Sequence, residues 1–155
     1  MRRQDREVVQ QNEIDAIIES CDCLRLGLNA EDGAYIVPLN FAYVPGKPAK
    51  FYFHSAKEGR KVDMIGQGAK AGFELDGAHR LGEAETGCRH TFFYQSVIGT
   101  GTVRPVETLE EKKQALSAIM AHYRKDCAFS FTDEQADAVA VFCLTAETMS
   151  CKQHS

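Results

Sequence analysis

The residues whose types and spacing could do chemistry lie in one short stretch, residues 51–61. Apolar residues there lead into Ser55, and three cations follow, Lys57, Arg60 and Lys61. We expect these cations in the first turn of a helix, where unpaired backbone N–H groups and a partial positive charge attract anions. Cations at that end of a helix oppose its dipole, so a bound anion would relieve the repulsion. The arrangement, with the hydroxyl of Ser55, predicts a site for a phosphate monoester.

The same stretch has a simpler interpretation that the spacing does not exclude. A charged run such as residues 57–61 is typical of a solvated loop or helix surface. His54 ends an expected strand and is either a hydrogen-bonded structural residue or a group that contacts a ligand and exchanges a proton. No glycine-rich nucleotide-binding motif accompanies the cations. From the residues alone, both interpretations stay open.

A second unusual feature is Pro38, which interrupts the regular strand pattern of residues 35–43. Proline has no backbone N–H to donate and therefore occurs at a sheet edge or a bulge. The neighbouring backbone groups would then be free to contact the polar rim of a flat heterocycle. The alternative is an ordinary edge proline that protects against aggregation. The pattern favours neither.

Alternating and helical periodicities predict the elements that position these residues. We expect strands at residues 24–29, 34–43, 50–54, 70–76, 91–106 and 138–145. Helices are expected at residues 12–21, with Asn12 as the cap, and at residues 57–66 and 109–123. Thr108 with Glu111 and Thr132 with Gln135 fit capping boxes, the second of which begins a brief helix. Residues 77–90 lack an apolar pattern and are expected to form a mobile loop.

The order of these elements predicts a mainly β fold. Six strands with two or three helices and no regular βαβ alternation argue against a doubly wound parallel sheet. An antiparallel sheet closed into a small barrel would leave no exposed edges, so a barrel with flanking helices is expected. The length of 155 residues fits a single domain over residues 1–155.

Charge and composition exclude several classes of function. The net charge of −4 argues against general nucleic-acid binding, which needs a surplus of cations. The longest apolar run, residues 138–144, is too short to cross a membrane, and no secretion signal is evident at the start. Six cysteines without such a signal indicate reduced thiols, so a cytoplasmic protein is expected.

Four segments are similar, in sequence and in order, to one known family. They are residues 1–6 (MRRQDR), 37–43 (VPLNFAY), 53–61 (FHSAKEGRK) and 94–101 (YQSVIGTG). The chain resembles the nitroimidazole-resistance proteins of the Nim type, a branch of the pyridoxamine 5'-phosphate oxidase-like, FMN-binding split barrels. The resemblance extends over nearly the whole chain and implies a six-stranded antiparallel split barrel of the Greek-key type.

The resemblance also implies a homodimer with a flavin at each subunit interface, FMN in the first place and FAD as the alternative. It implies that His54 lies close to the flavin and is the candidate catalytic residue. The residues that it assigns to the cofactor are Val37, Pro38, Leu39 and Asn40 along the ring, His54, Ser55, Ala56 and Lys57 at the ring and ribityl chain, Arg60 and Lys61 at the phosphate, and Gln95 and Ser96 on a later strand.

The resulting hypothesis is a flavin-dependent reductase of small acceptors such as nitroaromatic compounds. Residues 150–155 lack the arginine- and histidine-bearing segment with which true pyridoxamine-phosphate oxidases hold their substrate, so that activity is not expected. One rival is a flavin-binding protein without turnover, and a second is a haem-binding barrel with His54 as the axial ligand. A third is a metal site at Cys88 and His90 or at Cys151 and His154, although each pair supplies only half of a ligand set.

Overall fold

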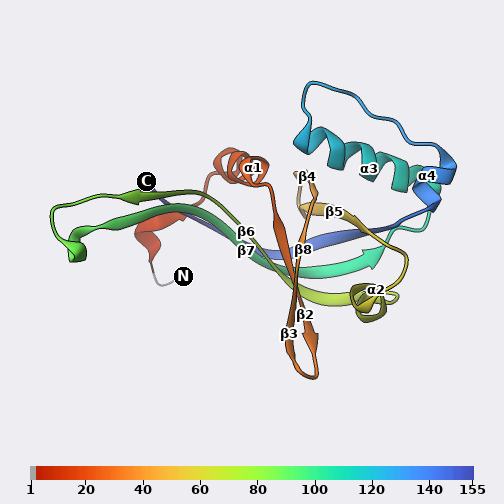
Figure 1. The fold of residues 1–155 in the computed structure, drawn as a ribbon, viewed down its shortest axis with the longest axis horizontal. Coiled ribbons are helices and arrows are strands. Elements are labelled where there is room, and N and C mark those ends of the chain that lie inside the picture. Colours follow the sequence, from red (N-terminus) through yellow and green to blue (C-terminus); the bar gives the residue numbers. More distant parts are fainter. Residues whose placement is uncertain (1–2) are drawn as a thin grey trace.

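A computed structural model describes residues 3–155 of the protein; Met1 and Arg2, which begin the first segment of the resemblance, lie outside the described residues. One antiparallel sheet forms the centre, and helices cover parts of its surface (Figure 1). Within residues 3–155, no helix is both long and apolar enough to span a membrane. The strands are β1 (Glu7–Val8), β2 (Leu24–Ala30), β3 (Gly33–Leu39), β4 (Ala42–Val44), β5 (Lys50–Ser55), β6 (Ala69–Gly82), β7 (Thr91–Pro105) and β8 (Ala140–His154). The helices are η1 (Gln4–Arg6), α1 (Gln11–Ser20), α2 (Arg60–Ile65), η2 (Gly87–Arg89), α3 (Leu109–Tyr123) and α4 (Asp133–Asp137).

The sheet has eight strands in the order β3-β2-β6-β7-β8-β5-β4, and β1 pairs with the end of β8. All pairs are antiparallel, so the predicted fold class, mainly β with flanking helices, is confirmed. Two details differ from the prediction. The described sheet has eight strands rather than six, and its hydrogen-bonded ladder does not close, because β3 and β4 at its two ends do not pair with each other.

The two edges of this sheet are joined by the chain itself, through Asn40 and Phe41 between β3 and β4. We predicted one strand over residues 34–43, but its two halves pair with different neighbours, β2 and β5. Phe41 is fully buried, and its backbone N–H donates to the hydroxyl of Tyr123 at 3.2 Å. That hydroxyl donates in turn to the carbonyl of Asp22 at 2.8 Å. The end of α3 therefore fixes the chain where it passes from one edge to the other.

The core lies inside the curved sheet and is rich in phenylalanine. Phe51 and Phe53 of β5 and Phe142 of β8 are almost completely buried, and Phe53 stacks on Phe142 with ring centroids 5.5 Å apart. Burial of a side chain of this size contributes about 1.5–3 kcal/mol. A smaller apolar cluster joins α3 and α4 to the outer face of β8. Both clusters position β5, which carries the predicted site.

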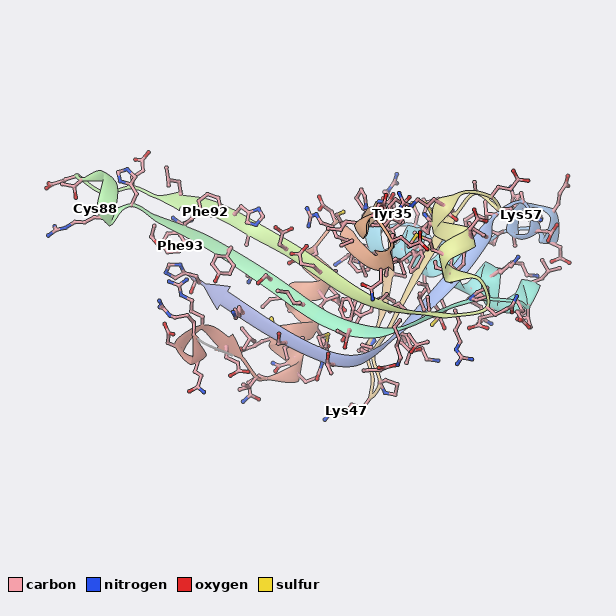
Figure 2. The ribbon with its side chains drawn as sticks, turned by 90° about the horizontal axis from the view of Figure 1, so that it is seen from below. Tyr35, Lys47, Lys57, Cys88, Phe92 and Phe93 are labelled. Atoms are coloured by element: carbon pink, nitrogen blue, oxygen red, sulfur yellow. The ribbon has the colours of Figure 1, made fainter. Side chains whose placement is uncertain are left out.

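A long hairpin of β6 and β7 takes up the first part of the loop predicted at residues 77–90, of which residues 83–90 lie outside the strands. β6 continues to Gly82, β7 begins at Thr91, and the pair projects away from the body of the protein (Figure 1). Near its tip Leu81 pairs with Phe92, and their side chains are 51% and 53% exposed (Figure 2). The prediction failed because neither face of this hairpin packs on the core, so its sequence shows no alternation of apolar and polar residues.

The last strand, β8, is also longer than predicted, since it runs to His154 rather than ending near residue 145. A register shift opposite Thr100 and Gly101 interrupts its alternation, and β7 pairs with it on both sides of that point. A side chain at Gly101 would collide with the carbonyl oxygen of Thr145. The backbone of β8 therefore approaches Gly101 too closely for a larger residue.

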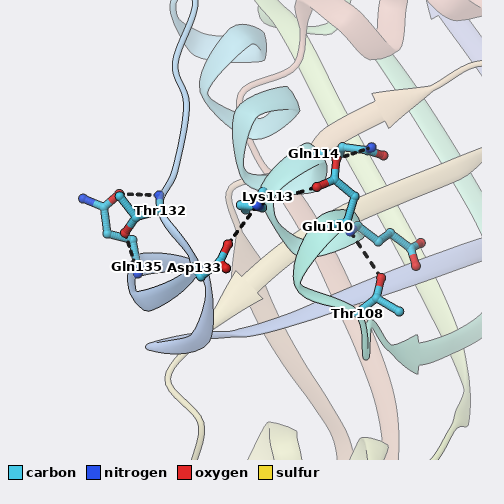
Figure 3. Close-up of polar contacts among 8 residues, drawn as sticks. Thr108, Glu110, Lys113, Gln114, Thr132, Asp133 and Gln135 are labelled. Atoms are coloured by element: carbon cyan, nitrogen blue, oxygen red, sulfur yellow. Dashed lines mark hydrogen bonds and ion pairs between the residues drawn. The ribbon is translucent and has the colours of Figure 1, made fainter.

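Two of the three helix caps predicted from sequence, Thr108 and Thr132, are present. Thr132 and Gln135 form the complete capping box of α4, with backbone-to-side-chain bonds of 3.0 and 3.2 Å (Figure 3). At α3, the Thr108 hydroxyl accepts from the backbone of Glu111, but the box is incomplete. The Glu111 carboxylate instead accepts a hydrogen bond from Tyr52 at 3.2 Å, because α3 packs on β5.

Asn12 is not the cap of the first helix, contrary to the prediction. The helix α1 begins at Gln11, and Gln10 in extended conformation takes the capping position without a side-chain bond. Ile17 and Ile18 are buried, as the apolar periodicity indicates.

Candidate functional site

The predicted phosphate site lies where β5 ends and α2 begins. Ser55 is the last residue of β5, and Gly59 caps α2 with a φ of 123°, a conformation that favours glycine. The helix therefore begins at Arg60, three residues later than predicted, and Lys57 belongs to the preceding loop. The Ser55 hydroxyl donates to the carbonyl of Ala56 at 2.7 Å, which leaves its oxygen lone pairs available. We call Ser55, Lys57, Arg60 and Lys61 the cation corner.

The lysines of the cation corner differ in their partners. Lys57 forms an exposed ion pair with Asp137 of α4 at 3.1 Å. Lys61 is partly buried, has no acidic partner within residues 3–155, and its pKa is lowered by that burial. A partly desolvated cation without an acidic partner is less stable than a paired one, so Lys61 is the member of the corner that gains most from an added anion.

Arg60 is held by the turn between β2 and β3. Its guanidinium donates to the carboxylate of Asp32 at 2.5 Å. Its central carbon also lies 4.6 Å from the ring centroid of Tyr35, a cation–π contact. Figure 2 shows Tyr35 and Lys57 at the end of the molecule opposite the hairpin tip at Cys88.

His54 lies beside the cation corner on the outer face of β5, where it pairs with Val141 of β8. Within residues 3–155 its ring makes no hydrogen bond, which argues against the structural interpretation of this histidine. The ring reaches solvent, yet the surrounding chain partly desolvates it, and this burial lowers the pKa of His54, as does the charge of Lys61. At neutral pH the imidazole is therefore mainly neutral.

The predicted ring-binding segment is the end of β3. Pro38 pairs with Arg25 of β2, and β3 is an edge strand, so the missing N–H of Pro38 leaves no ladder bond unmade. Both interpretations of Pro38 therefore remain compatible with its position. Val37 and Leu39 face the core, while Pro38 and Asn40 are exposed. A cavity of about 290 Å³ lies here, lined by Asp22, Cys23, Pro38, Leu39 and Asn40.

The chain before β4 and the end of β5 separate from each other near the predicted site. The ladder between β4 and β5 ends at the pair of Ala42 and Tyr52. Asn40, just after β3, and His54 on β5 each lie two residues beyond that pair, where the two segments no longer pair. Arg60 contacts Asp32 and Tyr35, so the start of α2 lies beside the β2–β3 hairpin that carries residues 37–39.

Gln95 and Ser96 are not brought to the same place. They lie on β7 at the base of the projecting hairpin, where the Gln95 amide donates to Gln153 at 3.1 Å. Pro105, at the other end of β7, lies in the same cross-strand row as Phe53 of β5. At about 3.3 Å per residue, Gln95 is roughly 33 Å along the strand from that row. In one chain these two residues cannot contact a ligand at the cation corner.

Sequence reasoning missed the acids that face the cation corner. Asp32 falls between two predicted strands, and neither Asp32 nor Asp137 was singled out. Their partners lie 28 and 80 residues away in the chain, and no local pattern reports such pairs.

The other candidate sites contain none of the predicted cofactor-binding residues and no group of three potential metal ligands within residues 3–155. A cavity of about 430 Å³ between β7, β8 and the start of α3 is lined by Arg104, Glu111 and Cys143, among others, and by none of the predicted site residues. Within residues 3–155, no three potential metal ligands lie together. All six cysteines are free, and burial raises the pKa of Cys21 and of Cys151 to about 11, so these two thiols are poor nucleophiles.

Comparison with known proteins identifies the family. The family model for pyridoxamine 5'-phosphate oxidase matches residues 10–153. The chain is similar to the crystal structure of a candidate 5-nitroimidazole antibiotic resistance protein from Bacteroides thetaiotaomicron, with 30% identity and a TM-score of 0.80. The match covers 95% of this chain and 86% of that chain. Among curated proteins, none matches the chain.

Two more distant structures share the fold. A FAD- and haem-binding protein from Mycobacterium smegmatis has 15% identity and a TM-score of 0.81, over 97% of this chain and 74% of that one. A flavocytochrome from Azotobacter vinelandii has 16% identity and a TM-score of 0.78, over 100% of this chain and 72% of that one. Because the family model matches nearly the whole chain, and the Bacteroides protein aligns along it at 30% identity, this chain belongs to the pyridoxamine 5'-phosphate oxidase family.

Proposed function

We propose that this protein is a flavin-dependent oxidoreductase that binds FMN and reduces small acceptors such as nitroaromatic compounds. The observation that carries the proposal is Lys61, a partly buried cation without an acidic partner in residues 3–155, next to Arg60. The phosphate monoester of FMN supplies the missing anion. Similarity to a protein named for 5-nitroimidazole resistance, and to one named for FAD and haem binding, supports a flavin and a nitro acceptor.

The ring of the flavin is assigned to the end of β3. Exposed backbone of an edge strand at residues 37–40 can exchange hydrogen bonds with the polar rim of a heterocycle. The phosphate is then assigned to the cation corner, and the ribityl chain to residues 54–57. This assignment is consistent with the cavity at Pro38, Leu39 and Asn40.

A cytoplasmic homodimer completes the proposed site. Gln95 and Ser96, which the family resemblance assigns to the cofactor, lie too far from the cation corner of their own chain. The same residues of a second copy can contribute if two chains pack face to face. Support comes from the outer face of the sheet, where Ile36 and Ile98 are 61% and 54% exposed, a position that a second copy would cover.

The chemistry divides between cofactor and chain. When bound, the flavin supplies the two-electron transfer to the acceptor. The cation corner anchors the phosphate, and β3 orients the ring. The neutral His54 ring carries one N–H, which can donate a hydrogen bond to an acceptor oxygen, while its second nitrogen can take up a proton. The chain thus binds, orients and exchanges protons.

The test is the visible spectrum of purified protein after incubation with FMN and removal of excess ligand. We expect a bound flavin, and oxidation of the reduced form by a nitroaromatic compound under anaerobic conditions. The double variant Arg60→Met/Lys61→Met should lose FMN. Its matched control is Arg124→Met/Lys125→Met, an adjacent Arg–Lys pair beyond the end of α3, which should retain FMN. A wild-type protein that takes up neither FMN nor FAD refutes the proposal.

The same spectrum separates the rival functions. A Soret band that is lost in His54→Ala identifies a haem protein in which His54 is the axial ligand. A bound flavin whose reduced form no acceptor oxidises identifies a flavin-binding protein without turnover. Equal turnover by His54→Ala and wild type removes His54 from the proposed chemistry.

A further inference from the structure

The turn between β2 and β3 places an acid directly against the cation corner. Asp32 lies at the tip of this hairpin, and its carboxylate accepts from Arg60 at 2.5 Å. Both side chains are largely exposed, at 70% for Asp32 and 48% for Arg60. The contact joins two side chains that lie outside the buried core. Its effect is therefore electrostatic, and it falls on the group that is proposed to hold the phosphate.

The charges of the corner are nearly balanced before any ligand arrives. Lys57 is matched by Asp137 and Arg60 by Asp32, which leaves Lys61 as the cation without an acid in residues 3–155. The hydrogen bond from Arg60 lowers the pKa of Asp32, so this carboxylate is ionised throughout the neutral range. A phosphate that approaches Arg60 must displace Asp32 or lie beside its negative charge.

We propose that Asp32 is a built-in competitor for Arg60, which weakens binding of the dianionic phosphate monoester of FMN more than binding of the phosphodiester groups of FAD. This inference rests on the proposed function and assigns to one residue the choice between the two flavins. A phosphate monoester carries about −1.5 to −2 on a single phosphate near pH 7, whereas FAD spreads about −2 over two linked phosphates, about −1 on each, so the phosphate group beside Asp32 carries more charge in FMN. Repulsion from a fixed carboxylate grows with that charge.

Tyr35 supports the side chain of Arg60 independently of Asp32, so the effect of the Asp32 charge can be measured without moving Arg60. Its ring lies 4.6 Å below the guanidinium and is itself packed against the core. When the carboxylate of Asp32 is removed, this contact still holds Arg60 over the site. The loss of Asp32 therefore frees donors of Arg60 without releasing the side chain.

The test compares the dissociation constants of FMN, FAD and riboflavin for wild type and Asp32→Asn, measured by flavin fluorescence. Asparagine before Gly33 suits a hairpin turn, so the variant should fold, which thermal unfolding checks. We expect FMN to bind about threefold to tenfold tighter at low salt. FAD should gain less, riboflavin, which has no phosphate, should not change, and high salt should remove the difference.

The matched control is Asp126→Asn, which removes another exposed acid bound to an arginine, Arg124, at 2.9 Å. It should leave all three constants unchanged. A second variant, Tyr35→Leu, removes the platform and should weaken FMN binding while leaving riboflavin unaffected.

Each outcome decides a different point. FMN binding that is unchanged or weaker in Asp32→Asn overturns the inference, as does an equal gain for FMN, FAD and riboflavin. In either case the wild-type protein still binds flavin, and the proposed function stands. If the wild type binds none of the three, the proposed function fails and the role of Asp32 fails with it.

Discussion

The two cations of the α2 start should contribute unequally to FMN binding, and the variants Lys61→Met and Arg60→Met measure the difference. Methionine keeps the apolar stem of either side chain and removes the charge. Lys61 forms no ion pair with an acid within residues 3–155, so its ammonium group is free to form a full charge-assisted hydrogen bond with the phosphate. Arg60 already donates to the carboxylate of Asp32, so only part of its hydrogen-bonding capacity is available to the phosphate.

The structure gives the expected sizes. A hydrogen bond between charged groups contributes about 1.5–3 kcal/mol, so Lys61→Met should weaken FMN binding by about tenfold to 150-fold. An exposed ion pair contributes at most about 1 kcal/mol, so Arg60→Met should weaken it by about fivefold. Because burial lowers the pKa of Lys61, removing its charge should leave the flavin-free protein as stable as before or more stable.

Fluorescence titration with FMN and with riboflavin provides the assay. The ratio of the two dissociation constants isolates the phosphate contribution, and thermal unfolding of the flavin-free protein reports the stability. A larger loss for Arg60→Met than for Lys61→Met would show that the ion pair with Asp32 does not occupy Arg60. Equal losses for FMN and riboflavin would place neither cation at the phosphate.

Three further predictions concern His54, β7 and α4. Because burial and Lys61 lower the pKa of His54, its NMR titration should fall below 6.5 and move upward in Lys61→Met. As pH falls, His54 is protonated first in the unfolded chain, so the free energy of unfolding measured in urea should decrease between pH 6.5 and the folded pKa. His54→Gln should abolish this decrease. Gly99→Ala places a methyl group against the ring of Phe73 and should lower the unfolding free energy by about 1–3 kcal/mol, measured in urea; an unchanged midpoint would contradict the close approach. Thr132→Ala removes the capping box of α4 and should lower the stability by about 0.5–2 kcal/mol, whereas Thr132→Ser should retain it.

Where sequence signals were local, they predicted the structure closely. The helix α3 spans residues 109–123 as expected, because Thr108 marks its start and a run of helix-favouring residues with an apolar face follows. The strand expected at residues 24–29 was equally clear, since β2 runs from Leu24 to Ala30. The residues of the cation corner were singled out for the same reason, since Ser55, Lys57 and the residues that follow lie within seven positions of one another; their role in binding stays a prediction.

Features that depend on residues far apart in the chain were not predicted from the sequence. The projecting hairpin is held by pairing between β6 and β7, and its exposed faces carry no periodicity. The break at Asn40 and Phe41 lies between a half of the segment that pairs with β2 and a half that pairs with β5. The pairing of Arg60 with Asp32 likewise depends on how the β2–β3 hairpin packs beside α2, which residue types alone do not specify.

The chain crossing at Asn40 and Phe41 has a mechanical consequence. Since β3 and β4 share no hydrogen bonds with each other, Asn40 and Phe41 are the direct link of the chain between the two edges of the sheet. Phe41 is buried and its backbone is tethered to α3 through Tyr123, so a displacement of either edge is passed on to that helix.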